Sequence, residues 1–305
     1  MAAGAQARRL SVAVVGLGGV GGGAADSLAA AGRHDITACT RQSIARFTLE
    51  RAEGTVEAPL RLLAEPAQAK PVDWVLVCTK THQTAAAGPW LARLCTPATR
   101  VAVLQNGIDH TARVAPLAGG ATIVPVLVYF NGERLASDRV RIRHAGSFDA
   151  VVADDGPGRA FVDLFEGTPL RIIRSGDFAT LAWRKLLINA VANPITALTL
   201  QRQAVLRRSD VRDLCRGILD EAVAAARAEG VKLAEDETAR TIATLENFSG
   251  ELGTSMYFDR LAGRRVEVEA LTGAIVAAGD RHGMAMPFNR ALLTLLRAIN
   301  DAISA

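Results

Sequence analysis

Residues 11–32 read SVAVVGLGGVGGGAADSLAAAG, and this stretch decides how the first half of the chain folds. The valine-rich run at 11–15 is typical of a buried strand, and the alanine-rich end is typical of a helix. Between them, GLGGVG fits the pattern G-x-G-x-x-G. Such a turn lets backbone N–H groups at the start of the helix approach a pyrophosphate. We therefore expect a dinucleotide at Gly16, Leu17, Gly18, Gly19, Val20 and Gly21, the alternative being a glycine-rich turn without a ligand.

Strand-like and helix-like segments alternate through the rest of the first half. The later strand candidates are mostly rich in valine and isoleucine, and several of them end in polar residues. This alternation predicts an α/β fold with a parallel, doubly wound sheet of the Rossmann type. We place this domain at residues 1–175. Its further strand candidates are ITACT (36–40), WVLVCTK (74–80), RVAVLQNG (100–107), TIVPVLVYFNG (122–132), VRIRHAG (140–146) and DAVVAD (149–154).

The pattern changes near residue 175, after which strand signals disappear and apolar residues recur at helical spacing. We expect an all-helical domain at residues 176–305. No repeat or low-complexity linker separates it from the first domain. The predicted helices span 178–200, 209–229, 235–247, 254–282 and 288–303.

Composition and charge exclude several classes of function. The chain has 305 residues, 50% of them hydrophobic, but no apolar run reaches the ~18–20 residues of a membrane helix. The net charge is +4 and aromatic residues make up only 5%, so the basic stripe with aromatic residues that favours nucleic acid is absent. A mildly positive balance suits a protein that handles small anions. We expect no membrane and no nucleic-acid partner.

The N-terminus and the cysteines indicate a cytoplasmic protein. The start, MAAGAQARRL, lacks the apolar stretch of an export signal. The cysteines at 39, 78, 95 and 215 are scattered, so neither a metal site nor a redox pair is expected. Free thiols in a reducing compartment are the plain interpretation.

Arg41 follows the second predicted strand, about 20 residues beyond the glycine motif, where an NAD enzyme carries an acidic residue. A guanidinium at this position can pair with the 2′-phosphate of NADP, which a carboxylate would repel. The sequence therefore favours NADP over NAD. The alternative is an ordinary surface arginine.

Polar residues follow two later strands, where ligands of open α/β sheets bind. Lys80 and Gln83 follow one strand, and Asn106 and Gly107 follow another. Lys80 could meet charge on the cofactor or the substrate, and Asn106 could donate a hydrogen bond near the nicotinamide. Each residue alone is as easily a cap or a loop residue, but their shared position at strand ends favours binding.

A polar stripe crosses the apolar helix predicted at 178–200. Lys185, Asn189 and Asn193 are spaced by four residues and fall within ~80° of each other on the helix, and Thr196 returns to the same face. There are structural alternatives without a ligand. Lys185 could reach toward solvent at the helix surface, and the two amides could be exposed or could cap a break at Pro194. In a chain with a dinucleotide motif, the stripe favours the wall of a ligand site.

These motifs together resemble the ketopantoate reductase (2-dehydropantoate 2-reductase) family. WRKLLINAVANPITAL at 183–198 is similar to the family's K-x-x-x-N-x-x-x-N-P helix, and TSMYFDRLAGRRVEVEALTGAIV at 254–276 is similar to its S-M-x-x-D…G-R-x-x-E segment. GLGGVG, the pair Lys80 and Gln83, and the Q-N-G of 105–107 extend the likeness over nearly the whole chain.

The resemblance implies NADPH-dependent reduction of a 2-keto acid, with 2-dehydropantoate reduced to pantoate for pantothenate biosynthesis. It implies that residues 176–305 form the substrate and catalytic domain, that Lys185 is the general acid and that Asn189, Asn193 and Ser255 bind substrate. Glu267 would complete the site beside substrate and cofactor, unless it forms a helix-surface ion pair with Arg264 or Arg265. Asn106 would bridge the cofactor ribose and the substrate region. Lys80 and Gln83 would bind cofactor.

The sequence departs from the family pattern at Gln203 and Leu252, where further asparagines are expected. Losing an amide that binds a substrate hydroxyl could cost ~1–3 kcal/mol, enough to change the preferred acid. A reductase of another 2-keto acid, a β-hydroxyacid dehydrogenase and a non-catalytic NADP(H)-binding module therefore remain alternatives. The oligomeric state also remains open, a homodimer included.

Overall fold

The computed structural model describes residues 8–51, 54–143 and 146–304. The segment 1–7, on which the expectation about export partly rests, and residues 144–145 of one strand candidate lie outside the described residues. The chain divides into two compact units: Met1–Gln105 with His110–Phe178, and Asn106–Asp109 with Ala179–Ala305. Among the described residues, neither unit has a helix of the length and apolarity needed to span a membrane.

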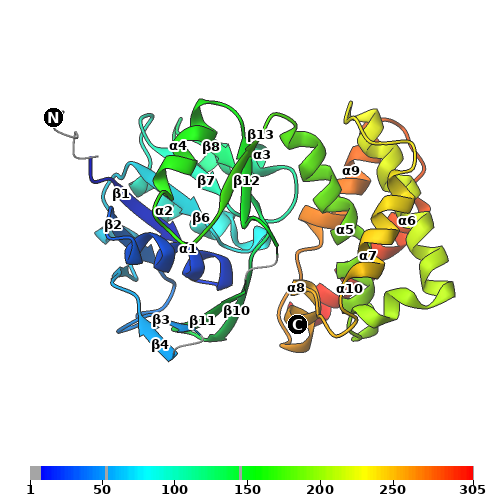
Figure 1. Cartoon of the computed structure of the whole chain (residues 1–305), viewed down its shortest axis with the longest axis horizontal. Coiled ribbons are helices and arrows are strands. Elements are labelled where there is room, and N and C mark those ends of the chain that lie inside the picture. Colours follow the sequence, from blue (N-terminus) through cyan, green and yellow to red (C-terminus); the bar gives the residue numbers. More distant parts are fainter. Residues whose placement is uncertain (1–7, 52–53, 144–145, 305) are drawn as a thin grey trace. The chain divides into compact units, whose positions relative to one another are not determined.

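A six-stranded parallel sheet forms the centre of the first unit, the Rossmann unit (Figure 1). The strand order is β5-β2-β1-β6-β7-β8, and each neighbouring pair is parallel. Val15 pairs with Cys39 on one side and with Val77 on the other, so the central strands end at one edge. The predicted doubly wound parallel sheet is confirmed. Its strands are β1 (Ser11–Val15), β2 (Asp35–Cys39), β5 (Arg61–Leu63), β6 (Trp74–Val77), β7 (Arg100–Val103) and β8 (Thr122–Pro125).

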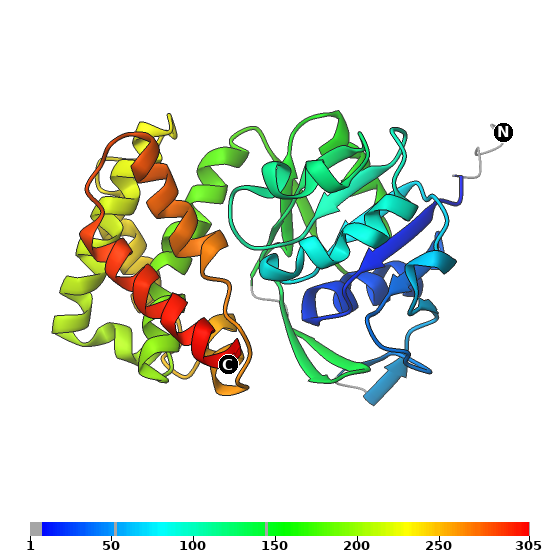
Figure 2. The ribbon, with the colours of Figure 1, turned by 180° about the vertical axis from the view of Figure 1, so that it is seen from behind.

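Helices cover both faces of this sheet, as the two opposite views show (Figures 1 and 2). Successive side chains of a strand point to opposite faces. Accordingly, Val14 shares a core cluster with Leu28 of α1, whereas Val15 shares another with Leu91 of α2. The helices are α1 (Gly19–Ala30), α2 (Gly88–Leu94), α3 (His110–Val114) and α4 (Gly156–Leu164), with 3-10 turns at Pro66–Gln68, Thr81–Gln83, Ala85–Ala87 and Ala115–Leu117.

A four-stranded sheet, which was not predicted from the sequence, packs on the glycine-rich face of α1. A Cβ atom on Gly22 would lie 2.5 Å from Cζ of Phe47, and one on Gly23 would lie 2.7 Å from Cδ1 of Ile142. The glycines of α1 therefore leave room for this sheet. It contains β3 (Thr48–Arg51), β4 (Gly54–Glu57), β10 (Asn131–Ala136) and β11 (Arg139–Arg143), and a third sheet contains β9 (Leu127–Val128), β12 (Ala150–Ala153) and β13 (Ile172–Ser175).

The second unit, the helical unit, is built around α5, which runs unbroken through Pro194. Leu187 and Val191 of α5 are fully buried in one core with Ile218 of α6 and Ile275 of α9. The predicted helical fold of the C-terminal half is confirmed. Its helices are α5 (Phe178–Thr199), α6 (Ser209–Ala228), α7 (Glu237–Asn247), α8 (Ser255–Leu261), α9 (Ala274–Arg281) and α10 (Pro287–Ser304), with a 3-10 segment at Gln203–Arg207 and a π-helical turn at Glu269–Gly273.

The prediction of a single helix at 254–282 is wrong. The chain leaves α8 at Ala262, turns at Gly263 with a φ of +62°, and becomes helical again only at Glu269. A residue with a side chain rarely adopts such a φ, so glycine at this position ends the helix. Glu267 consequently lies in a connection and not on a helix.

Candidate active site

The glycine loop between β1 and α1 has the geometry that its pattern predicts. Gly16 has a φ of +100°, and a Cβ atom there would lie 3.0 Å from the backbone nitrogen of Thr79. A Cβ atom on Gly21 would lie 1.9 Å from the carbonyl oxygen of Gly16. Only glycine therefore permits the tight turn and the close approach of α1 to it.

Gly18 and Gly19 differ in what surrounds them. A Cβ atom on Gly18 would meet no described atom within 4 Å, so packing does not explain this glycine. A Cβ atom on Gly19 would lie 1.9 Å from the carbonyl oxygen of Gly132, at the start of β10. Leu17 is buried in the core and Val20 packs against it. The surface at Gly18 is thus the part of the loop that is open to a ligand.

Arg41 lies just beyond the carboxyl end of β2, and its side chain is exposed. The hydroxyl of Thr40 donates to the backbone carbonyl of Gln42 at 2.8 Å and shapes the turn around it. The guanidinium is therefore available to a ligand that extends past β2.

Lys80 and Gln83 lie in one turn beyond β6, where the backbone N–H of Gln83 donates to the carbonyl of Lys80 at 2.8 Å. Gln105, at the end of the neighbouring β7, holds this turn. Its Nε2 atom donates to the carbonyl of Thr79 at 2.9 Å and to the hydroxyl of Thr84 at 2.8 Å. Sequence reasoning missed this role for Gln105, although its amide at a strand end was a signal.

The segment 106–109 belongs to the helical unit, whereas the residues on either side belong to the Rossmann unit. His110 is 1% exposed, and its Nε2 lies 2.8 Å from the carbonyl oxygen of Gln105. Arg113 donates to Oε1 of Gln105 at 3.0 Å and so orients its amide. Together with the φ of +95° at Gly107, these contacts fix where Asn106 leaves the sheet.

Asn106, Lys185 and Glu267 come together in the helical unit. Nδ2 of Asn106 donates to Oε2 of Glu267 at 3.0 Å. Burial lowers the pKa of Lys185 to about 8, and the negative charge of Glu267 partly opposes this shift. Glu267 is 5% exposed and does not lie on a helix, and Arg264 donates to Asp259, so the alternative of a helix-surface ion pair with Arg264 is not what the structure has. A lysine with this pKa can hold or release a proton near neutral pH.

The remaining residues of the predicted site lie on α5 and α8. Asn189 is partly buried one turn after Lys185, and Asn193 is 4% exposed one turn further. Ser255 is exposed at the first position of α8. A hydroxyl contact between Thr196 and Thr254 joins these two helices.

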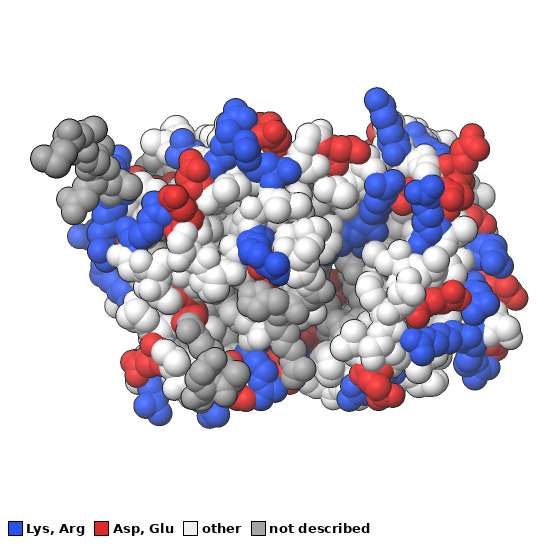
Figure 3. Space-filling model, in the orientation of Figure 1, with Lys and Arg blue, Asp and Glu red and all other residues white. Residues whose placement is uncertain are grey.

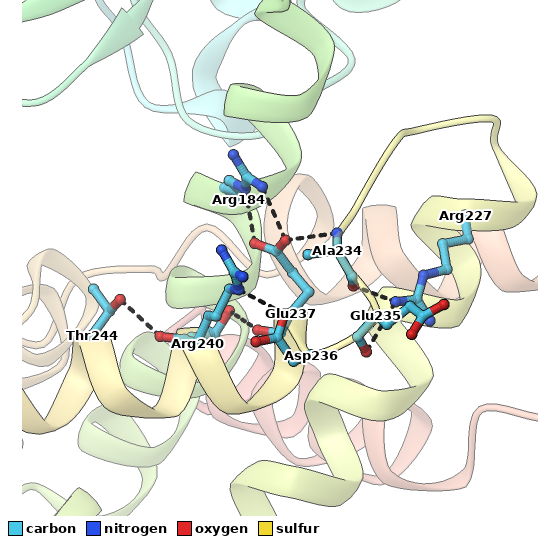
Figure 4. A network of polar contacts seen from close by, with 9 residues as sticks. Arg184, Arg227, Ala234, Glu235, Asp236, Glu237, Arg240 and Thr244 are labelled. Atoms are coloured by element: carbon cyan, nitrogen blue, oxygen red, sulfur yellow. Dashed lines mark hydrogen bonds and ion pairs between the residues drawn. The ribbon is translucent and has the colours of Figure 1, made fainter.

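The turn of α5 that carries Lys185 is held by its neighbour Arg184 (Figure 4). Its guanidinium donates to both carboxylate oxygens of Glu237, at 2.8 and 3.1 Å. Glu237 is 3% exposed and also accepts from the backbone N–H of Ala234 at 3.1 Å. This two-point pair ties α5 to the start of α7. Sequence patterns do not reveal this pair because the partners are 53 residues apart.

Gln203 and Leu252, the two positions that depart from the family pattern, are neighbours. The backbone N–H of Gln203 donates to the carbonyl of Leu252 at 3.0 Å. Leu252 is 51% exposed and lies two residues before Thr254. Both positions therefore border the start of α8.

Charged side chains outside the site are mixed. On the face shown in Figure 3, basic side chains are interspersed with acidic ones over both units.

The four cysteines are free thiols, and burial raises the pKa of Cys95 and Cys215 to about 11.

Comparison with known proteins places this geometry in a family. The model of ketopantoate reductase PanE/ApbA matches residues 12–155, and that of its C-terminal part matches residues 177–300. A 2-dehydropantoate 2-reductase of Caulobacter vibrioides is 38% identical over 94% of this chain and 98% of its own.

Solved structures share the fold. A dimeric ketopantoate reductase from Staphylococcus aureus, described with kinetic cooperativity, covers 96% of this chain and 100% of its own with a TM-score of 0.85 at 26% identity. A D-mandelate dehydrogenase with NADH and anilino(oxo)acetate covers 97% of this chain and 99% of its own with a TM-score of 0.85, but at 21% identity it shares the fold alone. The chain belongs to the ketopantoate reductase PanE/ApbA family.

Proposed function

We propose that this chain catalyses the NADPH-dependent reduction of 2-dehydropantoate to pantoate. The observation that carries the proposal is Lys185, whose pKa of about 8 makes it a proton donor near neutral pH. Asn189 and Asn193 follow it on the same face of α5 and offer neutral amides to a carboxylate and a hydroxyl. The family match favours this reaction over a β-hydroxyacid dehydrogenase and over a non-catalytic module.

The chemistry assigns each residue a step. When bound, NADPH would supply a hydride to the keto carbon. As the C=O double bond opens, its oxygen takes a proton from Nζ of Lys185, which is left neutral and regains a proton from solvent. Until then the ammonium stabilises the negative charge that develops on the oxygen. The carboxylate of Glu267 favours the charged form of Lys185, and Asn106 orients that carboxylate.

The Rossmann unit fits a dinucleotide. The open surface at Gly18 and the backbone N–H groups at the start of α1 would hold the pyrophosphate, with Leu17, Gly19 and Val20 shaping the loop. Exposed Arg41 would bind the 2′-phosphate and so select NADP over NAD. Lys80 and Gln83 would bind the cofactor from the next strand end, and Asn106 and Glu267 would meet its ribose.

A specific observation supports a second candidate substrate. Leu252 presents an apolar side chain where the family carries an amide, and Gln203 lies beside it. The missing amide would cost 2-dehydropantoate a hydrogen bond to its distal hydroxyl, so a 2-keto acid without that hydroxyl would lose less binding free energy at this position.

The test is to follow NADPH oxidation with 2-dehydropantoate beside a panel that includes 2-ketoisovalerate, which lacks the distal hydroxyl. We expect the highest kcat/KM with 2-dehydropantoate. A higher value with 2-ketoisovalerate would shift the assignment to the second candidate, and no NADPH consumption with any keto acid would refute a reductase.

We also propose that the chain forms a homodimer, by analogy with the dimeric relative from Staphylococcus aureus. Size-exclusion chromatography with light scattering should give twice the mass of the 305-residue chain. A single-chain mass at working concentrations would refute the dimer.

A further inference from the structure

Two buried threonine hydroxyls join α5 to α8. Oγ1 of Thr196 lies 2.7 Å from Oγ1 of Thr254, although 58 residues separate them in the sequence. Thr196 is 0% exposed and Thr254 is 8% exposed. Buried hydroxyls are stable only when their hydrogen bonds are made, so this contact is not incidental.

The contacts fix the direction of each hydrogen bond. The hydroxyl of Thr196 is 2.7 Å from the carbonyl oxygen of Ala192, which can only accept, so Thr196 donates there. The proton between the two hydroxyls must then come from Thr254. The oxygen of Thr254 in turn accepts from the backbone N–H of Tyr257 at 3.1 Å. The result is a directed chain from Tyr257 through Thr254 and Thr196 to Ala192.

This chain ends beside the proposed substrate residues on both helices. Ala192 immediately precedes Asn193 in α5, and Thr254 is the N-cap residue of α8, so it immediately precedes Ser255. Ser255 is exposed and therefore accessible, whereas its neighbour Thr254 is buried and bonded. The hydroxyl chain thus sets the backbone that presents Ser255 against the turn that presents Asn193.

We propose that Thr196 and Thr254 are positioning residues that place Ser255 for binding of the keto acid. The proposal rests on the proposed function and deepens it, because it names what holds the substrate-binding serine. Neither threonine needs to touch the substrate. Thr196 acts through Thr254, and Thr254 acts through the first turn of α8.

The alternative is that the pair serves only the stability of the core. The two explanations separate in steady-state kinetics. A purely structural pair would change the unfolding temperature and leave KM alone, whereas a positioning pair changes KM for the keto acid and leaves the Kd for NADPH unchanged.

The chain offers a matched control. Thr199 lies on the same helix, and its hydroxyl donates to the carbonyl of Ile195 at 2.7 Å, the same local bond that Thr196 makes to Ala192. Its side chain is exposed and has no part in the chain of hydroxyls. Thr199→Val therefore removes the same kind of local hydrogen bond without touching α8.

The experiment compares Thr196→Val, Thr196→Ser and Thr199→Val with wild type. We expect Thr196→Val to raise KM for the keto acid about five- to tenfold, in line with the loss of one buried hydrogen bond. Thr196→Ser should restore it and Thr199→Val should not change it. If Thr196→Val is not recovered folded, Thr196→Ala makes the same comparison. An unchanged KM in a folded Thr196→Val or Thr196→Ala variant overturns the proposal.

A double-mutant cycle tests whether Thr196 acts through Ser255. Ser255→Ala should raise KM in wild type and in Thr199→Val by the same factor, and by much less in Thr196→Val. Equal factors in all three backgrounds would overturn the proposal. Wild-type turnover reports separately on the proposed function, since it depends on neither comparison.

Discussion

Nδ2 of Asn106 donates a 3.0 Å hydrogen bond to Oε2 of Glu267, across 161 residues of sequence. The same carboxylate opposes the loss of charge on Lys185. The amide of Asn106 therefore holds the carboxylate of Glu267, and this carboxylate raises the pKa of Lys185, the residue that we propose as the proton donor.

The pH dependence of activity should report this tuning. The acid must be protonated, so kcat/KM should fall as the pH rises through about 8, the pKa of Lys185. Glu267→Gln keeps an oxygen that accepts from Asn106 but removes the negative charge. The pKa of Lys185 should then fall, and the alkaline limb should move to lower pH. A limb that stays in place, or moves to higher pH, would contradict the pairing.

Replacing Lys185 should abolish chemistry without abolishing cofactor binding. Lys185→Ala removes the only group that we assign to proton donation, and we expect kcat to fall by about 10²- to 10⁴-fold. Fluorescence titration should give an unchanged Kd for NADPH. Near-normal turnover in this variant would show that another group supplies the proton.

Arg41 should decide between the two nicotinamide cofactors. Arg41→Ala should weaken NADPH binding by roughly ten- to a hundredfold, the range expected for hydrogen bonds to a charged phosphate, and leave NADH binding nearly unchanged. Arg93→Ala, which removes an exposed arginine from α2, is the control. Equal losses for the two cofactors would argue against a 2′-phosphate site at Arg41.

Two glycines of one loop should respond in opposite ways to alanine. Gly21→Ala places a Cβ atom 1.9 Å from the carbonyl oxygen of Gly16, so the turn must open and the unfolding temperature should fall. Gly18→Ala meets no described atom within 4 Å and has an ordinary φ of −80°, so stability should stay near that of wild type. NADPH affinity should nevertheless fall. Tight NADPH binding by Gly18→Ala would place the pyrophosphate elsewhere.

His34 should make the Rossmann unit sensitive to acid. The residue is 7% exposed. Its Nδ1 accepts from the backbone N–H of Leu10 at 3.4 Å, and its Nε2 lies 3.2 Å from the carbonyl oxygen of Leu164. Burial lowers the pKa of His34 below its usual 6.5. The folded state thus binds fewer protons than the unfolded state, and stability should decline as the pH falls below 6.5.

The measurement is thermal unfolding between pH 7.5 and 5.5. The loss of stability should be smaller in His34→Gln than in wild type. His282→Gln, at a more exposed histidine beside Glu229, is the control and should follow wild type. If the unfolding temperature of the wild type does not fall over this interval, protonation of His34 does not lower the free energy of unfolding.

The local sequence pattern was sufficient to predict the structure wherever one short segment determines the geometry. The φ at Gly16 and the packing at Gly21 follow from strand, turn and helix in direct succession, and the face shared by Lys185 and Asn193 follows from helical periodicity. Periodicity failed at Gly263, because an apolar pattern continues across 254–282 while one positive φ redirects the chain. Links such as Thr196 to Thr254 and Arg184 to Glu237 were beyond reach, since nothing local to either partner specifies the other.

The excursion of residues 106–109 into the helical unit means that the backbone passes between the two units three times, after Gln105, after Asp109 and after Phe178. No single cut can therefore separate them. A fragment that starts at Ala179 would keep Lys185 and Glu267 but leave Asn106 behind, and a fragment that ends at Phe178 would carry Asn106 without its carboxylate. The residues that surround the proposed proton donor are therefore discontinuous in the sequence, and only the whole chain contains all of them.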